Sequence, residues 1–565
     1  MDTRRLILVF VFSLSLVMLW DAWQKYNHPP VPAQIASTAA AIDGSPIPSP
    51  SATQPAAASA ASVPTSASEQ VLAKNESVSI KTDLFVATVS TQGGDIIGLE
   101  LNKYKSVEDK NKQFSLFEAK HRYMAQSGLI GEGLPNHKTI FTLTNGSREL
   151  APEAKTLQLR LEAPVVDGVK VAKILTFNRG SYLIDVAYEI DNGSQKSVTA
   201  DAYYQLQRDI ESPAGESRTV STYTGPAVYT ESNKYQKISF SDIEKDKAKF
   251  NNKADNGWMA MVQHYFVSAW IPQEKLAREF YVRKLEGTTP PAVAAGVMVS
   301  APVVAPGSKV SYSVSLYAGP QIQSTLDQLA KPTAEGGIGA KGLSLVVDYG
   351  WLTIVAAPIF WCLEFIHKFV GNWGWSIVLL TICIKALFFP LSAASYKSMA
   401  KMKTITPRMT ALRERYGDDK AKLNVEMMNL YKTEKINPLG GCLPIVIQIP
   451  VFIALYWALL GAVEMRDAPW ILWIKDLSSQ DPYFVLPVVM MATMFIQTRL
   501  NPTPPDPIQA KITMFMPLIF GVMFFWFPSG LVLYWVVNNT LSIAQQWQIT
   551  RMMGGGAKAA NDAKA

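Results

Sequence analysis

The sequence has few of the residues that bind metals or form disulfides. Its three cysteines, Cys362, Cys383 and Cys442, lie in the apolar C-terminal region, so the polar segment 70–335 cannot form a disulfide. No two of the five histidines stand at metal-ligand spacing. The phosphate-binding Gly-Lys-Ser/Thr motif is missing, and no carboxylate pair or His constellation stands out. We therefore expect no metal and no cofactor, and we do not expect an enzyme.

The apolar residues are concentrated in the first 20 positions and again after about 343. Arg4 and Arg5 precede the apolar run 6–20, which ends in Trp20, and Trp23 comes soon after, where a cleavage site would be expected. Residues 1–27 are thus predicted to be an uncleaved signal-anchor helix with a cytoplasmic N-terminus. Residues 28–69 are rich in Pro, Ala and Ser, which is typical of an extended linker.

Between 70 and 335 the apolar residues alternate with polar ones, which predicts β-strands. The expected strands are 78–80, 84–89, 173–177, 182–190 and 310–317. A segment of this length and pattern predicts one large all-β sandwich. A groove for carbohydrate or peptide is an open alternative, because the sequence does not show what this domain binds.

A single charge lies near the middle of the most apolar stretch. Gly374–Ala394 is long enough to cross a bilayer, and Lys385 stands near its centre. A lysine at that depth costs on the order of 2.5–3.5 kcal/mol unless it faces protein or water. The nearer interface is about 15 Å away along the helix, so snorkelling to it is the less favoured alternative.

The loop that follows this stretch is basic, and the positive-inside rule places it in the cytoplasm. With the β domain outside, an odd number of crossings must separate the two, and Gly374–Ala394 is the stronger span. Trp351–Val370, within 336–373, is therefore predicted to be an amphipathic helix at the outer interface. The core 374–550 then holds five spans. Those after the first are 441–463, 483–499, 511–527 and 531–548. With the anchor this gives six transmembrane helices, both termini in the cytoplasm and a cytoplasmic tail at 551–565.

Polar side chains are concentrated at mid-depth and in the inner half of these spans. Thr381 lies one turn from Lys385 on the same helix face. The other candidates for a polar groove are Gln448, Gln497, Tyr534, Asn538 and Asn539. Buried amides need partners, so we expect a water-filled groove that opens to the cytoplasm and is sealed by apolar outer halves. Hydrogen bonding between helices is the alternative reading for some of the amides.

The cytoplasmic loop 396–435 has helical spacing over 396–415 and 419–434, which predicts an antiparallel hairpin. Methionines, Met402 and Met409 among them, recur on its apolar faces. The hairpin is either solvated beside anionic lipids or a docking arm for a ribosome, a targeting factor or an emerging chain, and both roles stay open. Its basic candidates are Lys401, Lys403, Arg408, Arg413 and Arg415.

Several short motifs resemble the YidC/Oxa/Alb family of membrane insertases. They are 371–374 (GNWG), Lys385 with Phe389-Pro390-Leu391, 399–402 (MAKM), 437–442 (NPLGGC) with Pro444 and Gln448, and 526–534 (WFPSGLVLY). The resemblance covers nearly the whole chain. It implies a Gram-negative inner-membrane protein with a five-helix core and a periplasmic β-supersandwich. It also implies that Lys385 is the basic residue of the groove and that Thr381 and Tyr534 face substrate.

The chain departs from many bacterial relatives, because they carry Arg where it has Lys385. The charge is kept but the bidentate geometry of a guanidinium is lost. The basic residues of the tail are few, which argues against strong ribosome binding through it.

The function we expect is that of a membrane protein insertase and chaperone. It moves hydrophobic segments of nascent proteins from the cytoplasm into the inner membrane, alone or with the Sec translocon. Expected partners are nascent membrane proteins, the Sec translocon, membrane lipids, the ribosome, and the signal recognition particle or its receptor. The alternatives are a membrane-anchored periplasmic chaperone or scaffold and, third, a cation-gated channel.

Overall fold

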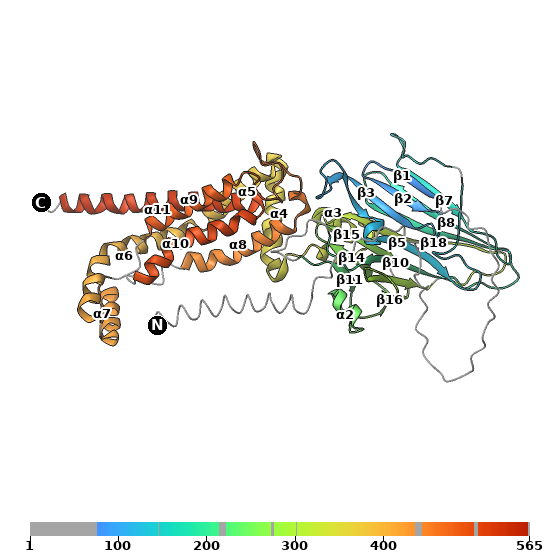
Figure 1. The fold of residues 1–565 in the computed structure, drawn as a ribbon, viewed down its shortest axis with the longest axis horizontal. Helices are drawn as coiled ribbons and strands as arrows, with labels where there is room; N and C mark the ends of the chain where they lie inside the picture. Colours follow the sequence, from blue (N-terminus) through green and yellow to red (C-terminus); the bar gives the residue numbers. More distant parts are fainter. Residues whose placement is uncertain are drawn as a thin grey trace. The chain divides into compact units, whose positions relative to one another are not determined.

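The computed structural model describes residues 76–144, 146–213, 222–272, 276–300, 302–417, 419–434, 443–501 and 507–562. The predicted anchor 1–27, the linker 28–69 and the motif 437–442 lie outside these residues. The described chain divides into two compact units (Figure 1). The β unit contains the chain up to Trp373 together with Val451–Ser478, and the helical unit contains Gly374–Pro450 and Ser479–Ala565.

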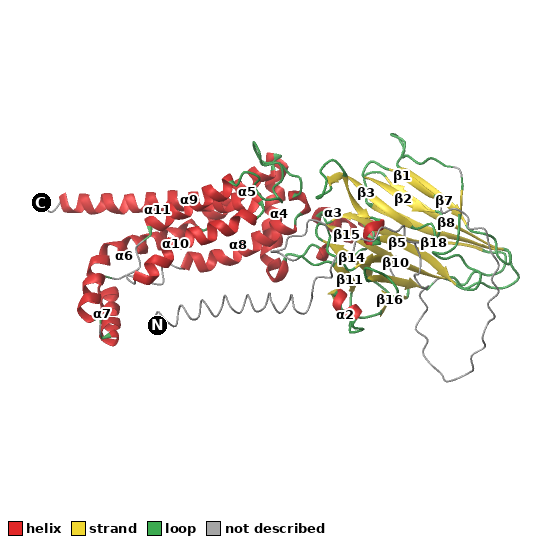
Figure 2. Ribbon diagram, in the orientation of Figure 1, coloured by secondary structure: helices red, strands yellow, loops and turns green. Residues whose placement is uncertain are grey.

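The β unit is built on two antiparallel sheets (Figure 2). One follows the order β1 (Ser77–Lys81), β2 (Phe85–Ser90), β3 (Ile96–Lys105), β5 (Met124–Ile130), β10 (Asp201–Asp209), β17 (Ala292–Val299), β16 (Arg278–Leu285) and β13 (Lys253–Ala254), and β4 (Gln113–Phe117) pairs with β3. The other follows the order β12 (Lys234–Lys237), β11 (Gly225–Thr230), β14 (Trp258–Gln263), β15 (Phe266–Pro272), β18 (Lys309–Pro320), β9 (Leu183–Asn192), β8 (Val169–Asn178), β7 (Thr156–Glu162) and β6 (Thr142–Leu143). The predicted all-β domain is confirmed.

The alternation seen in the sequence becomes the two faces of each strand. In β9, Ile184, Val186 and Tyr188 are buried, whereas the residues between them are partly exposed. The sheets meet through large buried side chains, among them Tyr204 and Trp270, whose ring centroids lie 5.0 Å apart. Burial of a large apolar side chain contributes about 1.5–3 kcal/mol, so this interior supplies the main driving force for the domain.

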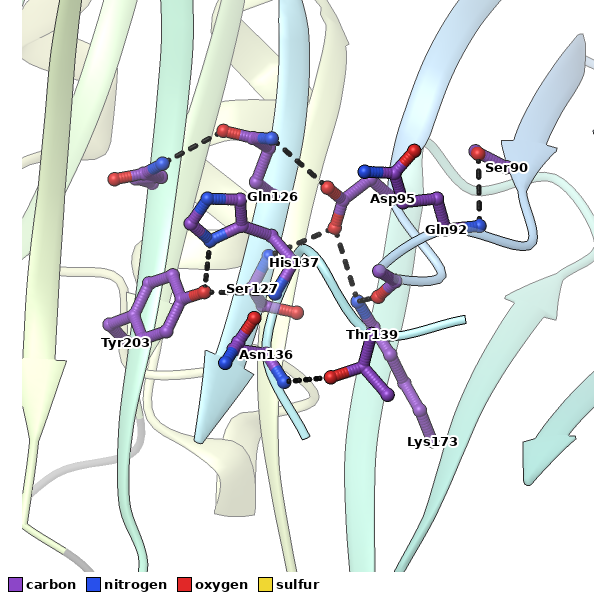
Figure 3. Close-up of polar contacts among 12 residues, drawn as sticks. Ser90, Gln92, Asp95, Gln126, Ser127, Asn136, His137, Thr139, Lys173 and Tyr203 are labelled. Carbon is purple, nitrogen blue, oxygen red and sulfur yellow. Dashed lines mark hydrogen bonds and ion pairs between the residues drawn. The ribbon is translucent and has the colours of Figure 1, made fainter. Parts of the chain in front are cut away.

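The interior of the β unit also contains a polar cluster (Figure 3). Lys173 donates to the carbonyl of Gly93 at 2.8 Å and pairs with Asp95 at 3.5 Å. Asp95 in turn accepts from the Gln126 side chain at 3.1 Å and from the Ser127 N–H at 3.3 Å. The lysine charge is therefore balanced by a carboxylate that is itself hydrogen-bonded, as burial of charge requires.

Short helices complete the β unit before the chain reaches the helical unit. They are η1 (Ala119–His121), α2 (Phe240–Glu244), α3 (Gln323–Ala330), η2 (Thr333–Glu335), η3 (Leu343–Val346), η4 (Gly350–Leu352) and, after α8, η6 (Val463–Met465). The longer α4 (Thr353–Val370) buries Ala356, Phe360 and Leu363. Its opposite side exposes an apolar stripe at helical spacing, which consists of Ile354, Trp361, Phe365 and Phe369.

The helical unit contains the predicted core helices, and α8 (Leu443–Gly461) begins in it and ends in the β unit. The other helices are α5 (Trp373–Leu387), α6 (Phe389–Tyr416), α7 (Lys420–Thr433), α9 (Val485–Leu500), α10 (Pro507–Met523), η7 (Phe524–Trp526) and α11 (Ser529–Asp562). α9 packs against both α10 and α11, and α6 packs against α11. Phe515, Leu518 and Ile519 of α10 are among many large apolar side chains left exposed. Such a surface is far more apolar than that of a soluble monomer and fits contact with lipid.

The first core span differs from its predicted form. The sequence predicts one helix over Gly374–Ala394, but the structure ends α5 at Leu387 and starts α6 at Phe389, with a bend of 67° between them. Pro390 explains the break, because it has no N–H to donate to the carbonyl of Ala386 and suits the first turn of a new helix. α5 is therefore 15 residues long, or about 22 Å.

Among the described helices, α4 is long and apolar enough by itself to cross a membrane. The bent pair α5 and α6 meets the same criteria if the two helices are taken together as one span. Three apolar segments are shorter: Gln448–Gly461, Val485–Leu500 and Ala510–Trp526. The coarse division into an all-β domain and a C-terminal helical region is thus established. The count of six spans and the interfacial position of α4 stay predictions.

Candidate functional site

The candidate site is built around Lys385 on α5, inside the helical unit. The side chain is 5% exposed, so its charge is enclosed by the surrounding helices. Its Nζ donates to the Ser542 hydroxyl of α11 at 2.6 Å, and that hydroxyl donates to the Asn538 carbonyl at 2.7 Å. Within the part of the chain that the structure describes, Lys385 forms no ion pair with a carboxylate. A buried ammonium held only by a neutral hydroxyl is poorly compensated.

A second set of contacts joins α8 to α11 beside this lysine. Gln448 donates from its amide to the Asn538 Oδ1 at 2.6 Å and also forms a side-chain hydrogen bond with Tyr534. Because Asn538 also accepts from Ser542 through its carbonyl, one turn of α11 connects Lys385 with Gln448. Four of the predicted groove residues, Lys385, Gln448, Tyr534 and Asn538, therefore belong to one network.

A third set of contacts joins α9 to the next turns of α11. The Gln497 amide donates to the Gln546 Oε1 at 2.7 Å, and the Gln546 amide donates to Asn501 at 3.2 Å. Asn539 lies 3.5 Å from the Thr493 hydroxyl, at the limit of a hydrogen bond. The Oε1 atom of Gln497 is buried and has no partner. An acceptor in that position can be satisfied by water or by a guest peptide.

The family resemblance implies that Thr381 faces substrate, but its side chain is enclosed in this structure. It is 1% exposed, and its hydroxyl donates to the Ile377 carbonyl of its own helix at 2.7 Å. Tyr534 is also 1% exposed. Both side chains are thus enclosed by the bundle in this state. Substrate contact at either position remains a prediction that requires the helices to part.

Sequence reasoning did not single out Ser542, although it lies in the polar inner half of its span. Its spacing of four residues from Asn538 on one helix could have identified it, because residues i and i+4 share a helix face. Thr493 and Asn501 were also missed. Each lies four residues from Gln497, so the same spacing could have identified both.

The hairpin of α6 and α7 has a methionine-containing interior. Ile405 and Met409 are buried between the helices, and Met402 and Met427 pack against them. Met428, in contrast, is 53% exposed. Met402, Met409 and Met427 thus contribute to the interior of the hairpin, and whether the hairpin also docks a partner stays a prediction.

The basic residues of the hairpin lie mainly on its outside. Lys401, Lys403 and Arg415 are exposed, and Arg413 is half-buried. Arg408 pairs with Glu434 at 2.6 Å across the two helices. An exposed pair of this kind contributes little stability, so Arg408 can exchange it for an anionic partner at little cost.

One group of side chains in the described residues could hold a metal ion by its donor types. His121, Asp209 and Glu211 offer ligand atoms within 4.8 Å of one another in the β unit. The His121 Nδ1 lies 2.9 Å from Asp209, and the Arg208 guanidinium lies 3.8 Å from the same carboxylate. The hydrogen bond with Asp209 raises the pKa of His121. A fixed cation beside the acid opposes metal binding, so the group fits a buried ion pair better.

Comparisons with known proteins match both halves of the chain. Residues 77–362 match the model of the YidC periplasmic domain, and residues 365–556 match that of the 60Kd inner membrane protein family. The membrane protein insertase YidC of Dechloromonas aromatica (strain RCB) is 63% identical over 565 residues, which cover 100% of both chains. The membrane protein insertase YidC of Aromatoleum aromaticum is 56% identical over 556 residues and covers 98% of each.

A solved structure of an active YidC insertase aligns with 84% of this chain and 92% of its own, at 17% identity and a TM-score of 0.40. The sequence matches extend over both the β unit and the helical unit. The chain belongs to the YidC family of membrane protein insertases.

Proposed function

We propose that this protein inserts nascent membrane proteins by offering their hydrophilic parts a polar path between α5, α8, α9 and α11. The observation that carries the proposal is the enclosed Lys385, whose amine is held by Ser542 and by no carboxylate in the described residues. Bulk water or an acidic guest would lower the cost of this charge. The site therefore favours a hydrated, acidic or polar chain segment.

The apolar part of the guest follows a different path. The exposed apolar faces of α9 and α10 include Val488, Phe515 and Ile519, and they would contact both lipid and the apolar part of the guest. A guest helix that passes along them gains about 25 cal/mol for each Å² of apolar surface removed from water. This gain supplies the driving force, so the mechanism needs no nucleotide and no bond-making chemistry.

We also propose a membrane topology for the chain and partners for its cytoplasmic hairpin. The chain would cross the inner membrane six times, with both termini in the cytoplasm and the β domain in the periplasm. The exposed cations of the hairpin, Lys401, Lys403 and Arg415, would meet anionic headgroups, the ribosome, or the signal recognition particle or its receptor. The protein would act alone or beside the Sec translocon and would also chaperone the folding of its guests.

Site-specific photo-crosslinking tests the path. A photoreactive residue replaces the half-buried Gln448 in one variant and the neighbouring, exposed Ile449 in a matched control. Ribosome-bound membrane proteins of increasing length are then added to vesicles that contain each variant. We expect crosslinks from position 448 once the apolar segment of the guest has emerged, and fewer from 449. Crosslinks from the β domain, with none from 448, would instead favour the periplasmic chaperone or scaffold.

A further inference from the structure

The connection between α8 and α9 is attached to the β domain by a set of specific contacts. Residues 462–478, here called the latch, follow α8 and belong to the β unit. Within it, Arg466 donates to the Lys105 carbonyl at 2.6 Å. Its guanidinium also lies 4.9 Å from the Phe114 ring centroid and 5.2 Å from that of Phe266. Cation–π contacts in a desolvated site stabilise such an attachment.

Further contacts hold the first half of the latch and the end of α8 that precedes it. Lys110 pairs with Asp467 at 3.2 Å, and Asn372 donates to the carbonyls of Pro469 and Trp470 at 3.1 Å. At the end of α8, the Nε2 of His264 lies 3.0 Å from the Leu460 carbonyl. Burial lowers the pKa of His264 to about 4, so the ring is neutral and Nε2–H can donate this bond.

Glu464 is the exception among these well-paired groups. It lies in η6, and its Oε1 is buried with no hydrogen-bond partner. The Gln323 backbone N–H at the start of α3 is close enough to donate to the carboxyl group. Glu464 as a whole is partly exposed, but one of its carboxyl oxygens is out of water and no described cation pairs with it, so its charged form is costly.

The groups around Glu464 do not supply a compensating charge. Tyr104 of β3, Tyr317 of β18 and Tyr349 before η4 face it with hydroxyls that burial keeps neutral by raising their pKa values. Glu364 of α4 adds a second negative charge, and Lys368 and Asp327 interact with Glu364. Arg466 is used by Lys105 and the aromatic rings.

We propose that the latch is proton-dependent, because it is held while Glu464 is a neutral carboxyl group and loosens when Glu464 ionises. The latch continues covalently into α9, which carries Thr493 and Gln497 of the polar network. The acidity of the compartment that contains the β domain would in this way set how firmly this helix connection is attached to that domain.

The direction of the effect follows from the raised pKa. Burial first, and then Glu364, raise the pKa of Glu464 to about 7. A group whose pKa is raised in the docked state contributes its full stability below its ordinary value of 4.5, and loses it as the pH rises through about 7. His264 titrates below this window and the tyrosines above it. The stability of the latch should therefore fall between pH 4.5 and pH 7 and stay low above it.

Hydrogen exchange measured by mass spectrometry on the full chain in lipid nanodiscs tests the proposal. Exchange of residues 462–478 is followed at pH 5.5, 6.5, 7.5 and 8.5 and corrected for the intrinsic pH dependence of exchange. We expect protection to fall roughly 30-fold from the lowest to the highest pH. Glu464→Gln, which is permanently neutral, should keep the low-pH protection at every pH. Glu153→Gln, at an exposed position in the same unit, serves as the matched control and should behave like wild type.

A second variant keeps the test decisive if Glu464→Gln folds poorly. Glu364→Gln removes the neighbouring negative charge and should move the midpoint of the transition to lower pH. Corrected protection that does not change with pH in the wild-type protein would overturn the proposal. A wild-type pH dependence that persists in Glu464→Gln, or an unmoved midpoint in Glu364→Gln, would do the same.

Discussion

Each of the two units encloses a lysine, and the two lysines are treated in opposite ways. Lys173 lies between the sheets of the β unit, where Asp95 balances its charge and the Gly93 carbonyl accepts its hydrogen bond. Lys385 lies between the helices, where the neutral Ser542 is its hydrogen-bond partner and no described carboxylate pairs with it. Both are nearly inaccessible, at 1% and 5% exposure.

The difference separates a structural charge from a functional one. A buried charge that is paired on every side adds specificity to one fold and has no capacity left for a partner. A buried charge with a neutral partner retains that capacity, at the expense of stability. We infer that the buried charge of the β unit stabilises one fold, whereas the buried charge of the helical unit is there to bind a polar or acidic segment of the guest.

The largest expected effect comes from breaking the paired charge. Lys173→Met would leave Asp95 buried without its cation, at a cost of about 3–5 kcal/mol to the β unit. Thermal unfolding of the full chain, followed by near-ultraviolet circular dichroism of the buried Trp258 and Trp270, measures the loss. Lys170→Met, on the same strand but exposed, is the matched control and should unfold like wild type. Equal midpoints for both variants would contradict a structural role for Lys173.

Replacing Lys385 should reduce insertion activity without reducing thermal stability. Lys385→Met removes a desolvated ammonium, so the thermal midpoint should stay at or above that of wild type. Insertion of a guest with an acidic flanking segment into proteoliposomes should fall on the order of ten- to a hundredfold, because a charge-assisted contact worth about 1.5–3 kcal/mol is lost. Lys385→Arg should retain insertion and Lys385→Glu should lose more. Full insertion activity in Lys385→Met would refute the role proposed for the charge.

The smallest effect is expected at the neutral partner of Lys385. Ser542→Ala removes the hydroxyl that holds the amine and should cost about 1 kcal/mol of interaction. Insertion should fall less than in Lys385→Met, and only for guests with acidic flanking segments. Insertion rates measured in parallel on guests with acidic and with neutral flanks test this expectation. Ser542→Thr keeps the hydroxyl and is the control. An equal loss for neutral guests would mean that Ser542 serves only helix packing.

Local pattern was enough to predict much of the fold. The alternation over 182–190 predicts a strand, and β9 forms there, since a period of two leaves one face apolar wherever the sheet is placed. The spacing over 419–434 predicts a helix in the same way, and α7 forms there. The break at Phe388 was not predicted although Pro390 follows it, because the strongly apolar residues on both sides of the proline favour one continuous span.

The candidate site was predicted less completely. Lys385, Gln448 and Asn538 are recognisable because a polar residue in an apolar run needs a partner, and the sequence alone determines that need. Only the tertiary structure decided the partners. It brought Ser542 to Lys385 across 157 positions, turned the hairpin methionines inward and placed Glu464 among the tyrosines of the β domain. Contacts between distant positions depend on how elements pack, and no local period encodes that packing.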